Sequence, residues 1–221
     1  MKFSRYIIFA LVLVLVDQGF KLWIHSSMAL GETQSIMGDW FKLHYILNPG
    51  IAFGLKLDFE YGKLLLSLVR LLAVVGLGWY TWSLFKKGAH RGLIATLALI
   101  WAGAFGNTID SVFYGVLIDG NAMAGSFTPW FHGQVIDMLY FPMIESHFPS
   151  WFPFWGGERF TFFSPVFNIA DACISVGFFV LLIFQGRFFP KEAPKEKEED
   201  TSEESTSTEP APTETDETPS A

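Results

Sequence analysis

The sequence is short of two things that many small proteins depend on, cysteine and charge. Cys173 is the only cysteine among the 221 residues, which excludes an intramolecular disulfide framework and a cysteine-rich zinc site. Residues 191–221 hold 11 of the 22 acidic residues and 3 of the 15 basic ones, so the net charge is −8 there and +1 in residues 1–190. A near-neutral body without a basic stripe argues against nucleic-acid binding.

Two common hydrolase motifs are also missing. The sequence has no H-E-x-x-H, which argues against a zinc protease, and no G-x-S-x-G nucleophile elbow. Cys173 lies in an apolar segment without a histidine, which favours a buried, inert thiol. We therefore expect no metal ion and no other cofactor, because the five histidines have no ligand spacing: His25, His44, His90, His132 and His147.

Long apolar runs are what the sequence does have. Residues 6–24, 64–85, 92–109 and 166–185 each approach the roughly 20 apolar residues that cross a bilayer. The first run could instead be a signal peptide, since Lys2 and Arg5 precede it. Asp17-Gln18 follows rather than a small-residue cleavage site, which favours a retained span.

The distribution of basic residues predicts the orientation. The ends of the chain and the short connection at residues 86–91 hold most lysines and arginines, and such segments face the cytoplasm. Both termini are therefore predicted to be cytoplasmic, with loops 26–63 and 110–165 outside. Aromatic residues crowd positions 127–163 and favour a loop on the bilayer surface, although a small packed extracellular domain is the alternative.

These observations predict an all-α membrane protein. We expect a domain of residues 1–190 with four transmembrane helices, an outward-facing loop with a small β region, and a surface-lying aromatic-rich loop. Residues 191–221 are rich in Glu, Thr, Ser and Pro without apolar period, so we expect a disordered acidic cytoplasmic tail.

Polar side chains in the spans are candidates for function because they are costly in lipid. Six of them share one depth near the outer ends of three spans: Asp17, Lys21, Asn107, Asp110, Asn168 and Asp171. The Asn/Asp pairs are spaced i,i+3, which places both side chains on one helical face. This pattern predicts a site that faces the outer leaflet rather than a transport path. Arg70 lies deeper in the second span and could snorkel outward or pair with a carboxylate.

Carboxylates are the reactive groups that remain. Two close carboxylates cannot easily both ionise, so one retains a proton. Such a pair can activate a water molecule with one member and protonate a leaving group with the other. The predicted chemistry is hydrolysis without a metal or covalent intermediate.

Four ordered elements resemble the bacterial lipoprotein signal peptidases, signal peptidase II. They are Asp17-Gln-Gly-Phe-Lys21, Asn48-Pro-Gly50-Ile-Ala-Phe-Gly54, Gly103-Ala-Phe-Gly106-Asn107-Thr-Ile-Asp110 and Phe167-Asn168-Ile-Ala-Asp171. They are similar to the family's D-Q-x-x-K, N-x-G-x-A-F, G-x-x-G-N-x-x-D and F-N-x-A-D elements. The resemblance covers about residues 5–186, and the ordered set is far more specific than any one element.

The resemblance implies a four-span aspartic endopeptidase of the bacterial inner membrane, with its active site near the periplasmic face. The implied substrates are diacylglyceryl-modified prolipoproteins, cut just before the lipidated cysteine. The implied partners are these substrates and membrane lipid, and we expect a monomer. One catalytic aspartate of the family maps to Asp171.

The second catalytic aspartate has two candidates. Gly133-Gln-Val-Ile-Asp137-Met138 carries the family's G-x-V-x-D-[FM] pattern, and Asp137 precedes an apolar run. Asp119 has the spacing after Asp110 that the compact family pattern shows, but Gly120-Asn121 follows it as in a solvated turn. We choose Asp137, with an insertion between Gly115 and Gly133.

The resemblance also suggests supporting roles. Asn107, Asp110 and Asn168 are predicted to bind substrate or support the acids, although the asparagines could instead join helices. Asn48 and Gly50 belong to a loop predicted to place an amide over the substrate. Asp17 and Lys21, spaced i,i+4, are predicted to form a structural pair.

One departure from the family pattern concerns a basic residue. Ser111 stands where the family usually has arginine, and that arginine would be expected to contact the lipid phosphate or the substrate backbone. Arg159, the only basic residue in the second outer loop, is a candidate replacement.

Two other classes of protein compete with this interpretation. A small transporter subunit or scaffold would explain four spans but not two acids beside asparagine pairs at one depth. A presenilin-like protease would require a G-x-G-D-type element, which the sequence lacks.

Overall fold

The structure is a computed structural model that describes residues 2–50, 61–142, 144–147, 149–151, 153, 157, 159–162 and 165–189. For residues 144–147 and 159–162 only the backbone is described. The end of the second family-like element, much of the aromatic-rich loop and the predicted tail lie outside the described residues. Residues 1–190 form one compact unit.

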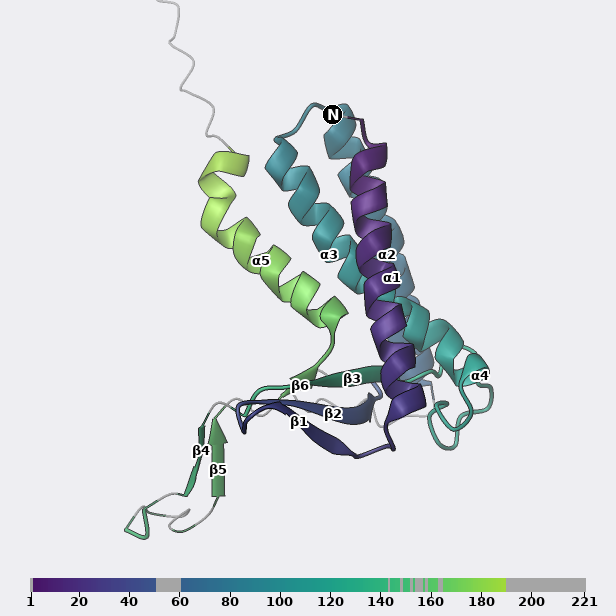
Figure 1. Cartoon of the computed structure of the whole chain (residues 1–221). Helices are drawn as coiled ribbons and strands as arrows, with labels where there is room; N and C mark the ends of the chain where they lie inside the picture. The colour runs from purple at the N-terminus through teal and green to yellow at the C-terminus, as the bar shows by residue number, and fades with distance from the viewer. Residues whose placement is uncertain are drawn as a thin grey trace, which may run out of the picture. The chain divides into compact units, whose positions relative to one another are not determined.

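Within the described residues, four helices are long and apolar enough to cross a membrane: α1 (Ser4–Ser27), α2 (Gly62–Lys86), α3 (Arg91–Ile109) with its continuation to Leu117, and α5 (Ile169–Phe188). Figure 1 shows them running up and down beside one another. Many large apolar side chains on α1, α2 and α5 are exposed, among them Leu15, Leu72 and Ile183. An apolar surface of this extent is stable in lipid rather than in water. The predicted fold class, a helical membrane protein with four spans and a small β region, is confirmed.

The fourth helix begins later than the sequence suggests. The apolar pattern predicts a start near residue 166, but Val166–Phe167 form the short strand β6 and the helix begins at Ile169. Asn168 is the residue that caps the helix, and its side chain accepts a hydrogen bond from the Asp171 backbone. A capping residue has non-helical backbone angles, so apolarity alone misplaces the boundary.

Helix α3 is the centre of the bundle. It packs against α1, α2 and α5, and 56% of its span is buried, against 17–28% for the other three. Glycine makes the closest approach possible, because a Cβ at Gly103 would lie 2.2 Å from the Ala170 carbonyl oxygen. Small residues allow helices to approach closely where lipid supplies no hydrophobic driving force between them.

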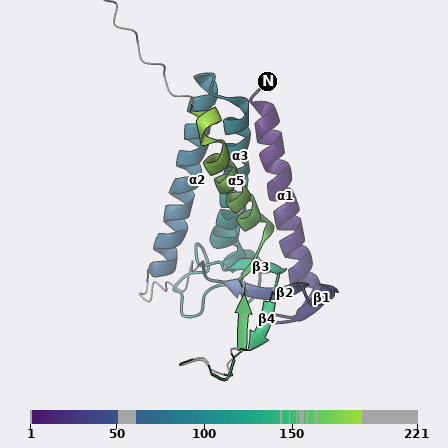
Figure 2. The same ribbon diagram turned by 90° about the vertical axis from the view of Figure 1, so that its left-hand side faces the viewer.

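A four-stranded antiparallel sheet lies at the end of the bundle where α1 and α3 end and α2 and α5 begin (Figures 1 and 2). Its order is β1 (Thr33–Met37), β2 (Phe41–Asn48), β3 (Val135–Tyr140), β6. Strands β4 (Ile144–His147) and β5 (Arg159–Phe162) form a separate hairpin.

Alternation along β3 divides its side chains between two environments. Ile136 and Met138 are fully buried in a cluster with Ile24 of α1 and Tyr114. The intervening Asp137 therefore faces the opposite side of the sheet. Because successive side chains of β3 point to opposite faces, Asp137 faces the polar residues of the bundle.

Helix α3 changes character where its polar residues begin. It continues as the π-helical turn η1 (Asp110–Tyr114) and the short helix α4 (Gly115–Leu117). Single π-helical turns inside helices are frequent at functional sites. The loop that follows returns to η1, since the Gly133 N–H donates to the Ser111 carbonyl oxygen at 3.1 Å.

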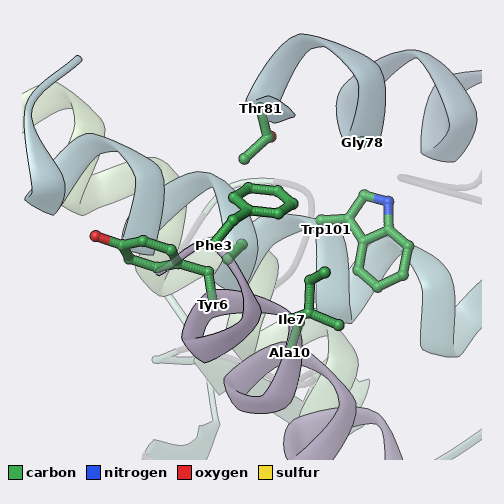
Figure 3. Close-up of a pocket in the computed structure, with 8 residues that line it drawn as sticks. Phe3, Tyr6, Ile7, Ala10, Gly78, Thr81 and Trp101 are labelled. Atoms are coloured by element: carbon green, nitrogen blue, oxygen red, sulfur yellow. The ribbon is translucent and has the colours of Figure 1, made fainter. Parts of the chain in front are cut away.

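An apolar cavity of about 260 Å³ lies between α1, α2 and α3. Figure 3 shows the Phe3, Ile7 and Trp101 side chains around it. The lining residues belong to the start of α1, the later turns of α2 and the middle of α3, whereas the polar residues considered for the site lie nearer the other end of these helices. The cavity is therefore separate from the polar site.

Candidate active site

Asp137 lies in the middle of the sheet and is 1% exposed. Asn48, the last residue of β2, pairs with Val135, so its side chain is a diagonal neighbour of Asp137 on the same face. Asn48 Nδ2 donates to Asp137 Oδ2 at 2.9 Å, and Asn168 Nδ2 donates to Asp137 Oδ1 at 2.7 Å. Each oxygen of this carboxyl group thus receives one amide donor.

Asp171 lies in the first turn of α5 and is partly exposed. It forms a capping box with Asn168, in which each side chain accepts a hydrogen bond from the other residue's backbone. Asn107 Nδ2 of α3 donates to Asp171 Oδ1 at 2.7 Å. Asn168 therefore contacts both acids, through its side-chain amide to Asp137 and its backbone N–H to Asp171.

The environment of Asp137 favours its protonated form. Burial of the carboxyl group, followed by the negative charge of Asp171, raises the pKa of Asp137 to about 7. The amide donors from Asn48 and Asn168 act in the opposite direction. The pair can thus hold one proton near neutral pH, which is what acid–base hydrolysis by two carboxylates requires.

A buried ion cluster supports the asparagines. Lys21 Nζ lies 2.8 Å from Asp17 Oδ2 and 2.7 Å from Asp110 Oδ2. It also donates to Asn107 Oδ1 at 3.1 Å, which fixes the orientation of the amide that donates to Asp171. The i,i+4 pair of Asp17 and Lys21 is therefore part of a larger cluster, and Asp110 contacts Lys21 rather than either proposed catalytic acid.

Gln18 is a residue to which the sequence assigned no role. Its side-chain amide donates to Asp110 Oδ1 at 2.8 Å and accepts from the Tyr114 hydroxyl at 2.9 Å. The neighbouring Asp17 accepts a hydrogen bond from the Ala170 N–H at 2.9 Å. The Asp-Gln dipeptide of α1 thus joins η1 to the start of α5. Its place in the family-like D-Q-x-x-K element was the signal that could have indicated this role.

Arg70 turns inward from α2. Its guanidinium donates to Ser111 Oγ at 2.8 Å and to the Gly50 carbonyl oxygen at 3.4 Å. The two alternatives that the sequence left open, snorkelling outward or pairing with a carboxylate, are thus replaced by hydrogen bonds to a hydroxyl and a carbonyl. Ser111 Oγ itself donates to the Asn107 carbonyl oxygen at 2.9 Å.

The remaining candidates lie elsewhere or are only partly described. Asp119 is exposed in a turn after α4, apart from the amide network around Asp171. Cys173 is buried in α5. Arg159 lies in β5, for which only the backbone is described. Among the described residues, no group of three or more His, Cys, Asp or Glu side chains could hold a metal ion.

The arrangement of helices and carboxyl groups defines a class of protein. Four membrane-length helices present two amide-bound carboxyl groups at one end of the bundle, where a helix terminus and a sheet meet. This is the architecture of an integral membrane protein with two carboxyl groups that share a contact with Asn168.

Comparison with known proteins then gives the family. The sequence model described as "Signal peptidase (SPase) II" matches residues 9–187. A lipoprotein signal peptidase from Porphyromonas gingivalis is 45% identical over 181 residues, which cover 78% of both chains. A lipoprotein signal peptidase from Amoebophilus asiaticus is 42% identical over 79% of this chain and 74% of its own length. One from Chlorobaculum parvum is 33% identical over 84% of this chain and 97% of its own length.

Solved structures agree on the fold. A bacterial membrane enzyme matches with a TM-score of 0.56 at 21% identity, over 87% of this chain and 94% of its own, and a second matches with 0.53 at 22%. The chain belongs to the signal peptidase II family and is a membrane protease of the hydrolase class. The predicted family and enzyme class are confirmed.

Proposed function

We propose that this protease removes the signal peptide from diacylglyceryl-modified prolipoproteins by cutting directly before the lipidated cysteine. The proposed nucleophile is a water molecule activated by Asp137 and Asp171. The observation that carries this proposal is the shared contact of Asn168, which bonds to both acids and so holds the strand residue beside the helix residue.

The proton distribution follows from the environments of the two acids. The raised pKa of Asp137 favours this residue as the holder of the shared proton. Asp171, which is more exposed, is then the base that takes a proton from the attacking water. As the water oxygen bonds to the scissile carbonyl carbon, Asp137 donates its proton to the carbonyl oxygen. The C–N bond then breaks while the leaving nitrogen takes the proton held by Asp171, and Asp137 regains a proton from the hydroxyl group that becomes the new carbonyl, which restores the starting state.

The choice of Asp137 over Asp119 is supported by burial and by partners. Asp137 is enclosed and receives two amide donors, whereas Asp119 is exposed in a turn. The close approach of Gly115 and Gly133 supports the proposal that the residues between them are an insertion.

The remaining site residues have supporting roles in this proposal. Asn107, Asn168 and Asn48 hold the carboxyl groups by amide hydrogen bonds, and Gly50 fixes Asn48 because its N–H donates to Asn48 Oδ1 at 2.8 Å. Asp110 anchors Lys21, which orients Asn107.

The proposed setting is the inner membrane of a bacterium, with both termini cytoplasmic and the acids near the periplasmic face. All polar residues of the site gather at the sheet end of the bundle, whereas Lys86 and Arg91 lie at the other end of α2 and α3. Basic segments favour the cytoplasmic side. The proposed enzyme is a monomer surrounded by lipid, with exposed Phe127 and Trp130 at the membrane surface.

The experiment changes Asp137, Asp171 and Asp119 separately to Asn in the full chain. Each protein, purified in detergent, is assayed for cleavage of a diacylglyceryl-modified precursor, and the new N-terminus is identified by mass spectrometry. We expect Asp137→Asn and Asp171→Asn to lose at least about 10³-fold in rate, because each removes a member of the proton-transfer pair.

Asp119→Asn is the matched control and is expected to keep wild-type activity. Loss of cleavage in Asp119→Asn with retention in Asp137→Asn would overturn the assignment of the second acid. The proposed function would be overturned if cells that lack this protein processed lipoproteins normally and the purified wild-type protein cleaved no precursor.

A further inference from the structure

Arg70 is a cation placed in the second span, and an ionisable group inside a membrane helix is costly unless it has a use. It lies on the face of α2 that also carries Lys63 and Ser67, at the helical spacing i, i+4, i+7. Lys63 and Ser67 are buried, and Ser67 Oγ donates to the Phe131 carbonyl oxygen at 2.7 Å. This face of α2 is therefore turned toward the protein rather than toward lipid.

The Arg70 guanidinium joins two segments that are far apart in the sequence. Nη1 donates to Ser111 Oγ on η1, and Nη2 donates to the Gly50 carbonyl oxygen after β2. The contact with Gly50 is close, since a Cβ built there would lie 2.8 Å from Nη2. Gly50 also has φ +93°, a conformation that side chains other than glycine rarely adopt.

Each segment that Arg70 contacts supports a different acid. On one side, the Gly50 N–H holds Asn48, which donates to Asp137. On the other side, Ser111 Oγ bonds to the backbone of Asn107, whose side chain donates to Asp171. A single side chain thus connects the supports of both carboxyl groups.

Arginine is suited to this position because its planar guanidinium presents several N–H donors in a fixed fork. A lysine is a compact charge with rotatable donors and cannot reproduce two divergent hydrogen bonds from one rigid plane. The charge acts as well as the geometry, because the guanidinium lies within electrostatic range of Asp171, Asp110 and Asp137.

We propose that Arg70 is a positioning residue of the active site, and that it places from α2 a cation beside position 111, where this chain has serine. It holds the Asn48–Gly50 segment against η1 and so sets the distance between the amide donors of the two acids. This inference rests on the proposed function of the acid pair, and it goes beyond it by naming a residue of another span on which the pair depends.

The test uses purified full-length protein and the lipidated precursor, with kcat and KM measured separately. We expect Arg70→Ala to lower kcat at least tenfold with KM changed less than about threefold, since it misplaces the acids without removing a substrate contact. Arg70→Lys should recover only part of this loss. Val69→Ala, a change at the exposed neighbouring residue of the same helix, is the matched control and should leave both constants unchanged.

A relocation variant separates positioning from general stability. In Arg70→Ala/Ser111→Arg, the new guanidinium starts from η1 and enters the space that Arg70 vacates. We expect it to recover kcat at least fivefold over Arg70→Ala, although both variants lack the native residue 70. Thermal unfolding in detergent shows whether each variant is folded.

The outcomes distinguish this inference from the proposed function. If the wild type cleaves the precursor and folded Arg70→Ala has wild-type kcat, or raises KM alone, the positioning role is overturned. If the folded double variant is no more active than Arg70→Ala, the inference that a guanidinium between α2 and η1 performs this positioning is overturned. A wild type that cleaves nothing contradicts the proposed function itself.

Discussion

At the scale of single residues, neutral amides hold the carboxyl groups of Asp137 and Asp171, and Lys21 contacts one of these amides. Asn48, Asn107 and Asn168 donate directly to the acids, whereas Lys21 contacts Asn107 and the two acids of its own cluster. A directly bound ammonium would favour the ionised form of both acids. Amides instead orient the carboxyl groups while leaving one of them able to keep a proton.

The first residue-scale prediction concerns pH and stability. Because the pKa of folded Asp137 is about 7 and that of an unfolded Asp is near 4, the folded protein binds a proton that the unfolded chain has lost between these values. The free energy of unfolding should therefore fall as pH rises from about 4 to 7 and become level above that. Thermal unfolding in detergent between pH 4.5 and 8 measures this decrease.

The matched variant for that experiment is Asp137→Asn, which has no titrating group at position 137. Its unfolding midpoint should depend less on pH in the same window than that of the wild type, by several degrees. Identical pH profiles for the two proteins would contradict the raised pKa.

At the scale of elements, the site is a junction of helix ends with one strand. The start of α5 meets the end of α3 because Gly103 and Gly106 have no side chains: a Cβ on Gly103 would lie 2.2 Å from the Ala170 carbonyl oxygen, and one on Gly106 would lie 3.3 Å from the Ala170 Cβ. Strand β3 then places Asp137 against Asn168, at the start of α5. The G-x-x-G part of the third family-like element is thus a packing requirement that places Asn107 beside Asp171.

The element-scale prediction is that Gly103→Ala destabilises the protein by about 1–3 kcal/mol, since overpacking forces backbone shifts. The added Cβ would lie 2.2 Å from the Ala170 carbonyl oxygen, in the first turn of α5. Cleavage should fall with it, because α5 carries Asp171. Unfolding in detergent and the precursor assay measure the two effects.

Gly76→Ala is the control, because a Cβ at Gly76 in α2 meets nothing within 4 Å. Alanine is also the better helix former, so its stability should be equal or slightly higher. Equal stability of Gly103→Ala and Gly76→Ala would contradict the close packing of α3 and α5.

At the scale of the whole molecule, polarity is sorted along the bundle. Exposed apolar side chains cover α1, α2 and α5, the central α3 is the most buried span, and the ion cluster lies at the sheet end. The apolar cavity of Figure 3 lies at the opposite end, lined by Phe3 and Tyr6. This separation places the proposed chemistry at one membrane surface and leaves the rest of the bundle to contact lipid.

The prediction at this scale concerns the acidic segment at residues 191–221. We expect a chain truncated after Pro190 to keep its unfolding midpoint within a few degrees and its cleavage rate within about twofold, since all site residues described above precede that position. The precursor assay on truncated and full-length proteins measures this. A loss of tenfold or more would contradict the assignment of residues 1–190 as the complete catalytic domain.

The sequence by itself determined the four spans and the family. Apolar runs of membrane length follow from the cost of placing polar side chains in the bilayer core. The four ordered elements, ending in Asn168 and Asp171, are local patterns that a chain displays without folding. It also placed Asp137 in a candidate motif and Ser111 as a departure from the family.

The tertiary structure decided what the local patterns could not. Sequence spacing does not give which distant side chains meet, so the shared contact of Asn168, the bonds of Gln18 and the direction of Arg70 required the packed bundle. The sequence favoured Asp137 over Asp119 by its motif, and the fold adds that Asp137 is buried in β3, an inner strand of the sheet, whereas Asp119 is exposed in a turn. Helix packing and strand pairing act between segments, and that is why only the fold brings these groups together.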